Sequence, residues 1–118
     1  MSRSVLGFSL ALALAACGAP AAAEDAQLIA DGHEIALKVC AICHVAAEDQ
    51  TVPPTMKPPA PRFVEIAERP NITEPFLRDF LTKPHGQARA LSAMASFLMG
   101  GYESDAVIAY LMSLKAKR

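Results

Sequence analysis

Two cysteines and a histidine stand together in the segment Cys40-Ala41-Ile42-Cys43-His44. On a helical backbone, side chains three and four positions apart share one face, so both thiols and the imidazole point to the same side. Two thiols so placed can form thioether bonds to the vinyl groups of a porphyrin, while the imidazole binds its iron. The C-x-x-C-H spacing is typical of c-type haem attachment. We therefore predict one covalent haem c, attached at Cys40 and Cys43, with His44 as the proximal iron ligand.

A C-x-x-C pair can also form a redox-active dithiol or one half of a zinc site. A dithiol oxidoreductase requires a strand–helix–strand context, which this sequence does not predict. A structural zinc site needs four ligands, and no second cysteine pair follows the first. His33 or His85 could complete the number, but neither has the spacing of a zinc finger. Haem attachment is the stronger interpretation.

The second axial ligand of the iron must come from another part of the chain. The candidates after the motif are four methionines and one histidine: Met56, Met94, Met99, Met112 and His85. Met112 lies in a predicted apolar helix, where packing is its expected role. Met56 lies in a proline-rich loop close to the motif, and His85 precedes a glycine, as in a turn. The other two methionines occupy a loop that can fold over the open face of the haem.

The first 23 residues have the features of an export signal. Arg3 is followed by an apolar run over residues 5–16, and these 12 residues fall short of a membrane-spanning helix. The small residues 21–23 are typical of a cleavage site, which predicts a leader of residues 1–23 and a mature domain of residues 24–118. The protein is therefore expected in the periplasm.

The sequence also contains a second possible cleavage site for the leader. Residues 14–17, Leu-Ala-Ala-Cys, resemble the lipobox of bacterial lipoproteins. In that case the leader is residues 1–16, Cys17 is lipidated, and residues 17–25 tether the domain to a membrane. Either way only two of the three cysteines remain available to the mature domain, so a disulfide framework is not expected.

The rest of the chain predicts short helices and no strands. The first helix is expected to begin near Asp31, which has capping-box spacing to Glu34, and to continue into Cys40. A loop over residues 48–62 follows, because its five prolines remove backbone donors. A short helix is predicted over residues 63–68.

Two further helices are predicted after residue 70. Thr73 is the expected N-cap of one, with an apolar face at Phe76, Leu77, Phe80 and Leu81. Ser104 is the expected cap of the last helix, whose apolar stripe consists of Val107, Tyr110, Leu111 and Leu114. Residues 24–118 carry 10 basic and 12 acidic groups, without the clustered basic surface that nucleic-acid binding requires. We expect no nucleic-acid partner.

After the leader, the chain resembles the small class I c-type cytochromes over nearly its whole length. In that family a glycine precedes the first haem cysteine by eight residues, as Gly32 does here. The terminal helix of the family has an A-Y-L-x-S-L pattern, here residues 109–114. The axial methionine of the family precedes the tyrosine of this pattern, Tyr110, by about sixteen residues. This resemblance places Met94 as the distal iron ligand, with Met99 as the alternative.

The resemblance implies an all-α cytochrome c fold, in which three to five short helices wrap around one covalent haem and the first and last helices cross at Gly32 and Tyr110. In the family a proline-loop carbonyl accepts a hydrogen bond from the proximal imidazole, and Pro58 or Pro59 is the expected counterpart. Two positions depart from the family pattern. Ala95 replaces the frequent proline after the axial methionine, which leaves that loop less rigid, and Ala36 replaces a frequent aromatic residue.

The function implied by the resemblance is that of a one-electron carrier rather than an enzyme. A histidine and a methionine together leave no open iron position for a substrate. The expected partners are redox proteins that bind transiently, and we expect a monomer. One alternative is an electron-transfer subunit of a larger periplasmic dehydrogenase or oxidoreductase. Another is a haem enzyme or gas-binding protein with an open iron site.

Overall fold

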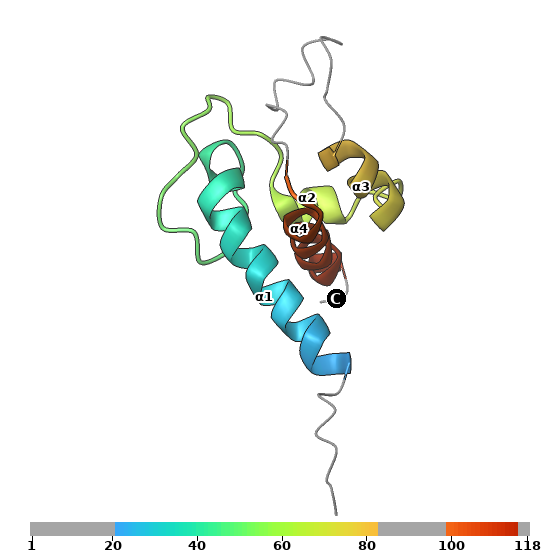
Figure 1. Ribbon diagram of the computed structural model, residues 1–118. Coiled ribbons are helices and arrows are strands. Elements are labelled where there is room, and N and C mark those ends of the chain that lie inside the picture. The colour runs from blue at the N-terminus through green and yellow to red at the C-terminus, as the bar shows by residue number, and fades with distance from the viewer. Residues whose placement is uncertain (1–20, 83–98, 116–118) are drawn as a thin grey trace, which may run out of the picture.

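The computed structural model describes residues 21–82 and 99–115. In these ranges the chain forms four α-helices and one short 3-10 helix (Figure 1). They are α1 (Ala21–Val39), η1 (Cys40–Ile42), α2 (Phe63–Ala67), α3 (Glu74–Thr82) and α4 (Gly101–Lys115). The described part contains no strand, and only an isolated bridge pairs His44 with Ala60. The prediction of an all-helical fold is confirmed. In the same ranges no helix combines the length and the apolar character needed to cross a membrane.

α1 and α4 pack against each other (Figure 1). Gly32 of α1 is buried where they meet. A Cβ atom built on Gly32 would lie 1.9 Å from the carbonyl oxygen of Ala106 and 2.9 Å from the Cβ atom of Tyr110. Both distances are shorter than real Cβ contacts, so only glycine allows the two backbones to approach this closely. The prediction that Gly32 and Tyr110 mark the crossing of the first and last helices is confirmed.

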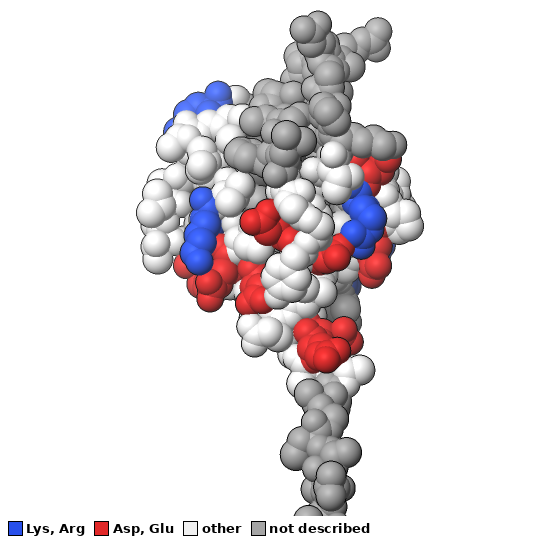
Figure 2. All heavy atoms as spheres, in the orientation of Figure 1, with Lys and Arg blue, Asp and Glu red and all other residues white. Residues whose placement is uncertain are grey.

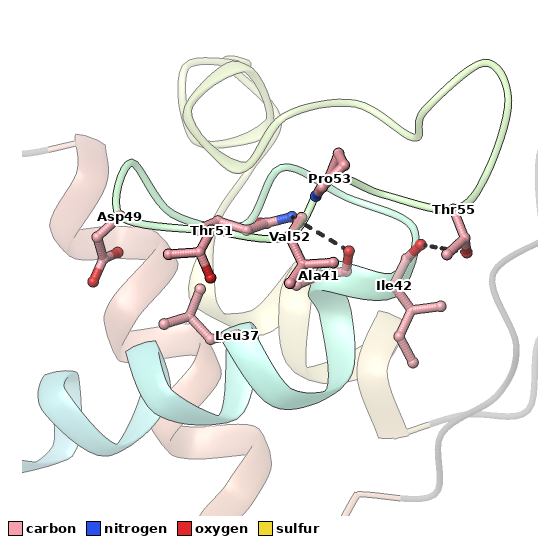
Figure 3. A pocket seen from close by; sticks show the side chains of 9 residues that line it. Leu37, Ala41, Ile42, Asp49, Thr51, Val52, Pro53 and Thr55 are labelled. Atoms are coloured by element: carbon pink, nitrogen blue, oxygen red, sulfur yellow. Dashed lines mark hydrogen bonds between the residues drawn. The ribbon is translucent and has the colours of Figure 1, made fainter.

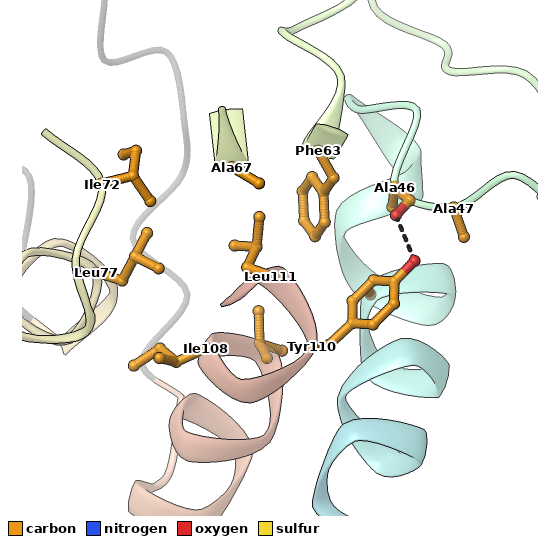
Figure 4. Packing of buried hydrophobic residues seen from close by; sticks show 11 residues of the cluster. Ala46, Ala47, Phe63, Ala67, Ile72, Leu77, Ile108, Tyr110 and Leu111 are labelled. Atoms are coloured by element: carbon orange, nitrogen blue, oxygen red, sulfur yellow. Dashed lines mark hydrogen bonds between the residues drawn. The ribbon is translucent and has the colours of Figure 1, made fainter. Parts of the chain in front are cut away.

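The buried cluster lies between α4 and the elements that surround it (Figure 4). Val107, Tyr110 and Leu111 of α4 are buried, as their helical spacing predicts. Leu114, the fourth residue of the predicted stripe, is partly buried against the same cluster. The other helices and the loops add small, branched and aromatic side chains: Ala36, Ala46, Ala47, Phe63, Ala67, Ile72 and Leu77.

The prediction for the start of the first helix is wrong. α1 begins at Ala21, well before Asp31. Alanine has the highest helix propensity, and Glu24 in the first turn interacts favourably with the helix dipole. The Asp31 carboxylate is therefore inside the helix, where it accepts hydrogen bonds from Gln27 Nε2 at 2.8 Å and from the Tyr102 hydroxyl.

The predicted cap of the last helix is also wrong, because α4 begins at Gly101. The carbonyl oxygen of Gly100 accepts a hydrogen bond from the Ser104 N–H at 3.0 Å. The Glu103 carboxylate in turn accepts one from the Gly100 N–H at 2.8 Å, so this glutamate performs the capping. Ser104 is fully buried, and within residues 21–82 and 99–115 its hydroxyl has no hydrogen-bond partner.

The two short helices begin and end close to their predicted positions. α2 spans Phe63–Ala67, and α3 begins directly after Thr73. The Thr73 hydroxyl accepts a hydrogen bond from the Phe76 N–H at 3.3 Å, which confirms Thr73 as the N-cap. Leu77 is buried as predicted, whereas Phe76 is 42% exposed and lies outside the core.

Candidate functional site

The chain runs from α1 directly into η1, and this junction carries Cys40, Cys43 and His44. The carbonyl oxygen of Cys40 accepts hydrogen bonds from the N–H groups of Cys43 at 3.1 Å and of His44 at 2.9 Å. One tight helical turn therefore holds both thiols and the imidazole, as the spacing predicts. Both cysteines are half-buried and free, so no disulfide ties them together.

The protonation of the thiols argues against a dithiol oxidoreductase. Burial, with a smaller contribution from Cys43, raises the pKa of the Cys40 thiol to about 11. The thiolate is the reactive form in disulfide exchange, and catalytic cysteines of that class have lowered pKa values. In this fold Cys40 is a neutral thiol at pH 7.

The imidazole of His44 is oriented by a backbone carbonyl. Its Nδ1 atom lies 2.7 Å from the carbonyl oxygen of Pro61. Because a carbonyl oxygen can only accept, Nδ1 carries the proton, and Nε2 keeps its lone pair for a metal. The expectation of a proline-loop carbonyl is correct, but the residue is Pro61 and neither Pro58 nor Pro59.

The position of Pro61 follows from the pairing of its neighbours with the turn. The Ala60 N–H donates to the Cys43 carbonyl at 2.9 Å, and the Phe63 N–H donates to the Val45 carbonyl at 3.0 Å. These two bonds flank Pro61 and lay its carbonyl oxygen against the His44 ring. Sequence spacing alone does not define this register, because it depends on the path of the loop between residues 48 and 60.

The segment after His44 is anchored to both long helices. The Tyr110 hydroxyl of α4 donates to the carbonyl oxygen of Ala46 at 3.1 Å. His33 Nε2 of α1 lies 2.8 Å from Asp49 Oδ1, and the His33 ring meets the Tyr110 ring edge-on at 5.2 Å. The hydrogen bond from His33 lowers the pKa of Asp49. His33, considered above as a zinc ligand, thus has a structural partner in the loop.

Gln50 is a site residue that sequence reasoning missed. Its carboxamide contacts the backbone at Ala46, His44, Ala41 and Val52. Backbone partners leave no pattern in a sequence, so no signal pointed to this glutamine.

The candidates for the second axial ligand are only partly placed. Met94 and His85 lie outside the described residues, as does Cys17. Met99 and Met112 are partly buried and pack against the core cluster. This agrees with the packing role predicted for Met112.

The donor set of the turn fits a haem. The turn offers two uncommitted thiols and one imidazole whose Nε2 is free, all within five consecutive residues. In the described ranges no group of three or more His, Cys, Asp or Glu side chains is close enough to hold a metal ion. A haem would use all three of these side chains, with one thioether bond to each cysteine and one iron–nitrogen bond to the histidine.

Comparison with known proteins identifies the family. The profile of the cytochrome c family matches residues 29–115. Cytochrome c-552 of Bradyrhizobium diazoefficiens is 34% identical over 115 residues, which cover 98% of this chain and 99% of that protein. No solved structure matches the chain significantly. The chain therefore belongs to the cytochrome c family, as a small class I c-type cytochrome that binds one covalent haem c and carries electrons between redox partners.

Proposed function

We propose that Cys40 and Cys43 bind the haem through two thioether bonds and that His44 Nε2 and Met94 are the axial ligands of its iron. The observation that carries this assignment is the turn itself, in which two free thiols and an imidazole oriented through Nδ1 follow one another on one helical backbone. The bound haem supplies a one-electron couple between Fe(III) and Fe(II).

The protein's own contribution is to hold the proximal ligand in one orientation. The Pro61 carbonyl keeps the proton on Nδ1 of His44, which leaves Nε2 as the ligand and makes it a stronger donor. Neighbouring backbone bonds from Ala60 and Phe63 keep that carbonyl in place. A site held in this way needs little rearrangement when the charge of the iron changes, which suits a carrier better than an enzyme that must bind substrate at the iron.

Met94 is proposed as the distal ligand on its spacing from Tyr110. The packing of Met99 against the buried cluster supports this choice, because a side chain engaged in the core is less free to bind iron. With both axial positions filled, no site remains for oxygen or peroxide.

We further propose that the protein works in the periplasm, either soluble after removal of residues 1–23 or tethered through lipidated Cys17. Its partners are redox proteins that bind briefly over a small interface. Acidic side chains gather on the half of the molecule where α1 begins (Figure 2). Glu24 and Asp25 lie in the first turns of this helix, whereas Lys38 lies in its last turn, next to the site.

The attachment is tested by producing the protein in a host that matures c-type cytochromes and measuring its intact mass. The expected mass is that of the polypeptide plus one haem, and it is lost in Cys40→Ser/Cys43→Ser. The soluble and membrane fractions also report the cleavage point and any acyl groups on Cys17. A colourless wild-type protein with two alkylatable thiols would contradict the proposal.

The distal ligand is tested separately with Met94→Ala and the matched variant Met99→Ala. Met94→Ala is expected to lose the Fe(III)–sulfur charge-transfer band and to bind carbon monoxide rapidly when reduced. Met99→Ala is expected to keep the band. Rapid carbon monoxide binding by the reduced wild type at neutral pH would instead support the haem enzyme or gas-binding alternative.

A further inference from the structure

The carboxamide of Gln50 lies half-buried beside the turn that carries the two thiols and the imidazole. Its oxygen accepts a hydrogen bond from the Ala46 N–H at 2.8 Å. Its Nε2 group faces three carbonyl oxygens, those of Val52 at 2.8 Å, His44 at 3.2 Å and Ala41 at 3.4 Å. Carbonyl oxygens only accept hydrogen bonds, so this surrounding determines which end of the amide is the nitrogen.

We propose that Gln50 is a positioning residue for His44. This inference rests on the proposed function, in which His44 binds the iron. The N–H of His44 is held by the Cys40 carbonyl at 2.9 Å and its ring Nδ1 by the Pro61 carbonyl at 2.7 Å. Gln50 holds the remaining polar group, the His44 carbonyl oxygen. The backbone N–H, the backbone carbonyl and the ring of His44 then each have a separate hydrogen-bond partner.

No second group of the described residues makes this contact. In residues 21–82 and 99–115, Gln50 makes the one hydrogen bond found to the His44 carbonyl. A pocket of about 260 Å³ lies on the same side, between the end of α1 and the following loop (Figure 3). Gln50 lines it, and Ile42 and Val52 at its rim are 53% and 68% exposed. Because this side is open, the turn lacks the dense packing that would otherwise hold it.

The same amide also joins the turn to the loop that follows it. Ala41 lies in η1, and Val52 lies in the loop beyond the imidazole. A single planar group therefore ties η1, which begins at Cys40, to the loop that follows His44. Outer partners of this kind orient a metal ligand and tune its basicity.

The test compares Gln50→Met with the wild-type protein, both with haem attached. Methionine has a similar length and no strong donor or acceptor, so it removes the four contacts without opening a large cavity. We expect the hyperfine-shifted proton resonances of the His44 ring to move. We also expect the midpoint potential to rise, because a less firmly held Nδ1–H···O bond makes the imidazole a poorer donor and favours Fe(II).

Thr55→Val is the matched control. The Thr55 hydroxyl donates to the Ile42 carbonyl at 3.1 Å, in the same turn but away from His44, and the Thr55 N–H still holds that carbonyl at 2.9 Å (Figure 3). We expect this variant to keep the wild-type potential and the wild-type His44 resonances. A merely structural role for Gln50 would lower the melting temperature without moving either quantity.

A measurement on the unmodified protein covers the case in which Gln50→Met fails to mature. The Nε2 proton of Gln50 that faces the part-buried carbonyls of His44 and Ala41 is expected to exchange with solvent more slowly than that of a free amide. Exchange as fast as that of a free amide would overturn the inference. So would a haem-bearing Gln50→Met protein with unchanged potential and unchanged His44 resonances, and that result would leave the proposed function intact. A wild-type protein without haem would remove the proposed function and this inference with it.

Discussion

At the scale of single residues, the hydroxyl of Tyr110 joins α4 to the loop after His44. It donates to the Ala46 carbonyl at 3.1 Å, and both residues are buried. Burial, together with the nearby charges of Asp49 and Glu48, raises the pKa of this tyrosine, so the hydroxyl stays neutral at pH 7. A neutral hydroxyl is the donor that the buried carbonyl requires.

Tyr110→Phe is expected to lower the free energy of unfolding by about 1–2 kcal/mol, because it leaves a buried carbonyl oxygen without its donor. Tyr102→Phe is the matched control, since the Tyr102 hydroxyl also donates to a single acceptor, Asp31, but the residue is 59% exposed. Denaturant titration of both variants measures the difference. Equal losses would show that the burial of the Ala46 contact does not matter.

The ion pair of His33 and Asp49 predicts a pH dependence. The hydrogen bond from His33 holds the pKa of Asp49 below its ordinary value of 3.8. The unfolded chain therefore binds more protons than the folded one as the pH falls past 3.8, and folded-state stability is lost there. The stabilisation is fully present above pH 3.8 and disappears as the pH falls through the lowered pKa.

Melting curves between pH 3 and pH 6 test this sign. The difference in melting temperature between the wild type and Asp49→Asn is expected to be largest at the upper end and to shrink towards the acidic end. Glu48→Gln is the control, because it removes a negative charge from the neighbouring residue and leaves the His33–Asp49 contact intact. The melting temperatures of Glu48→Gln and the wild type are expected to differ little at any pH in this range. A difference in melting temperature between the wild type and Asp49→Asn that grows as the pH falls would contradict the lowered pKa of Asp49.

At the scale of the helices, the crossing of α1 and α4 depends on one missing side chain. The Cβ atom of an alanine at Gly32 would overlap the carbonyl oxygen of Ala106, which is backbone and cannot rotate away. Relief requires the two helices to move apart, and the residues packed on either side, including Ala36 and Val107, then lose contacts.

Gly32→Ala is expected to destabilise the protein by about 3 kcal/mol, the upper part of the usual range for overpacking. Gly101→Ala is a matched control, because a Cβ atom at Gly101 has no neighbour within 4 Å. Alanine in the first turn of α4 is expected to be neutral or slightly stabilising. Thermal unfolding followed by circular dichroism compares the two, and an unchanged melting temperature in Gly32→Ala would exclude the close crossing.

At the scale of the whole molecule, the protein core is small. A chain of roughly 100 residues buries only about two-thirds of the surface exposed in its unfolded state. Many buried side chains here are alanines, which contribute little apolar area: Ala36, Ala46, Ala47, Ala67 and Ala106. A large apolar macrocycle at the centre would supply the missing contacts, much as a structural metal does for other small domains.

Cys40→Ser/Cys43→Ser is therefore expected to be largely unfolded, because it cannot retain haem covalently. Far-UV circular dichroism measures the loss of helix directly. Cys17→Ser is the matched control, since it changes a cysteine outside the haem-binding turn and is expected to retain haem and fold normally. Wild-type helicity in the double serine variant would show that the polypeptide folds without its cofactor.

The sequence alone determined the kind of protein. The C-x-x-C-H spacing implied covalent haem, and Gly32 together with residues 109–114 predicted the helix crossing that the structure contains. These features could be predicted from the sequence because each depends on residues close together in the chain or on a position that tolerates only one residue type. The first haem ligands need one helical turn, and close helix packing needs a glycine.

The tertiary structure alone decided which distant groups support the turn. The carbonyl of Pro61 rather than that of Pro58 or Pro59 accepts the hydrogen bond from His44 Nδ1–H, because the register of the loop depends on backbone bonds made by Ala60 and Phe63. Gln50 could not be foreseen, since its partners are backbone carbonyls that every residue possesses. The starts of the first and last helices were predicted wrongly for a related reason. Asp31 and Ser104 have side chains that can cap a helix, but both lie inside helices that begin earlier in the chain, at Ala21 and Gly101. The types and spacing of neighbouring residues determine which ligands one turn can offer, whereas the path of a loop results from the packing of the whole chain.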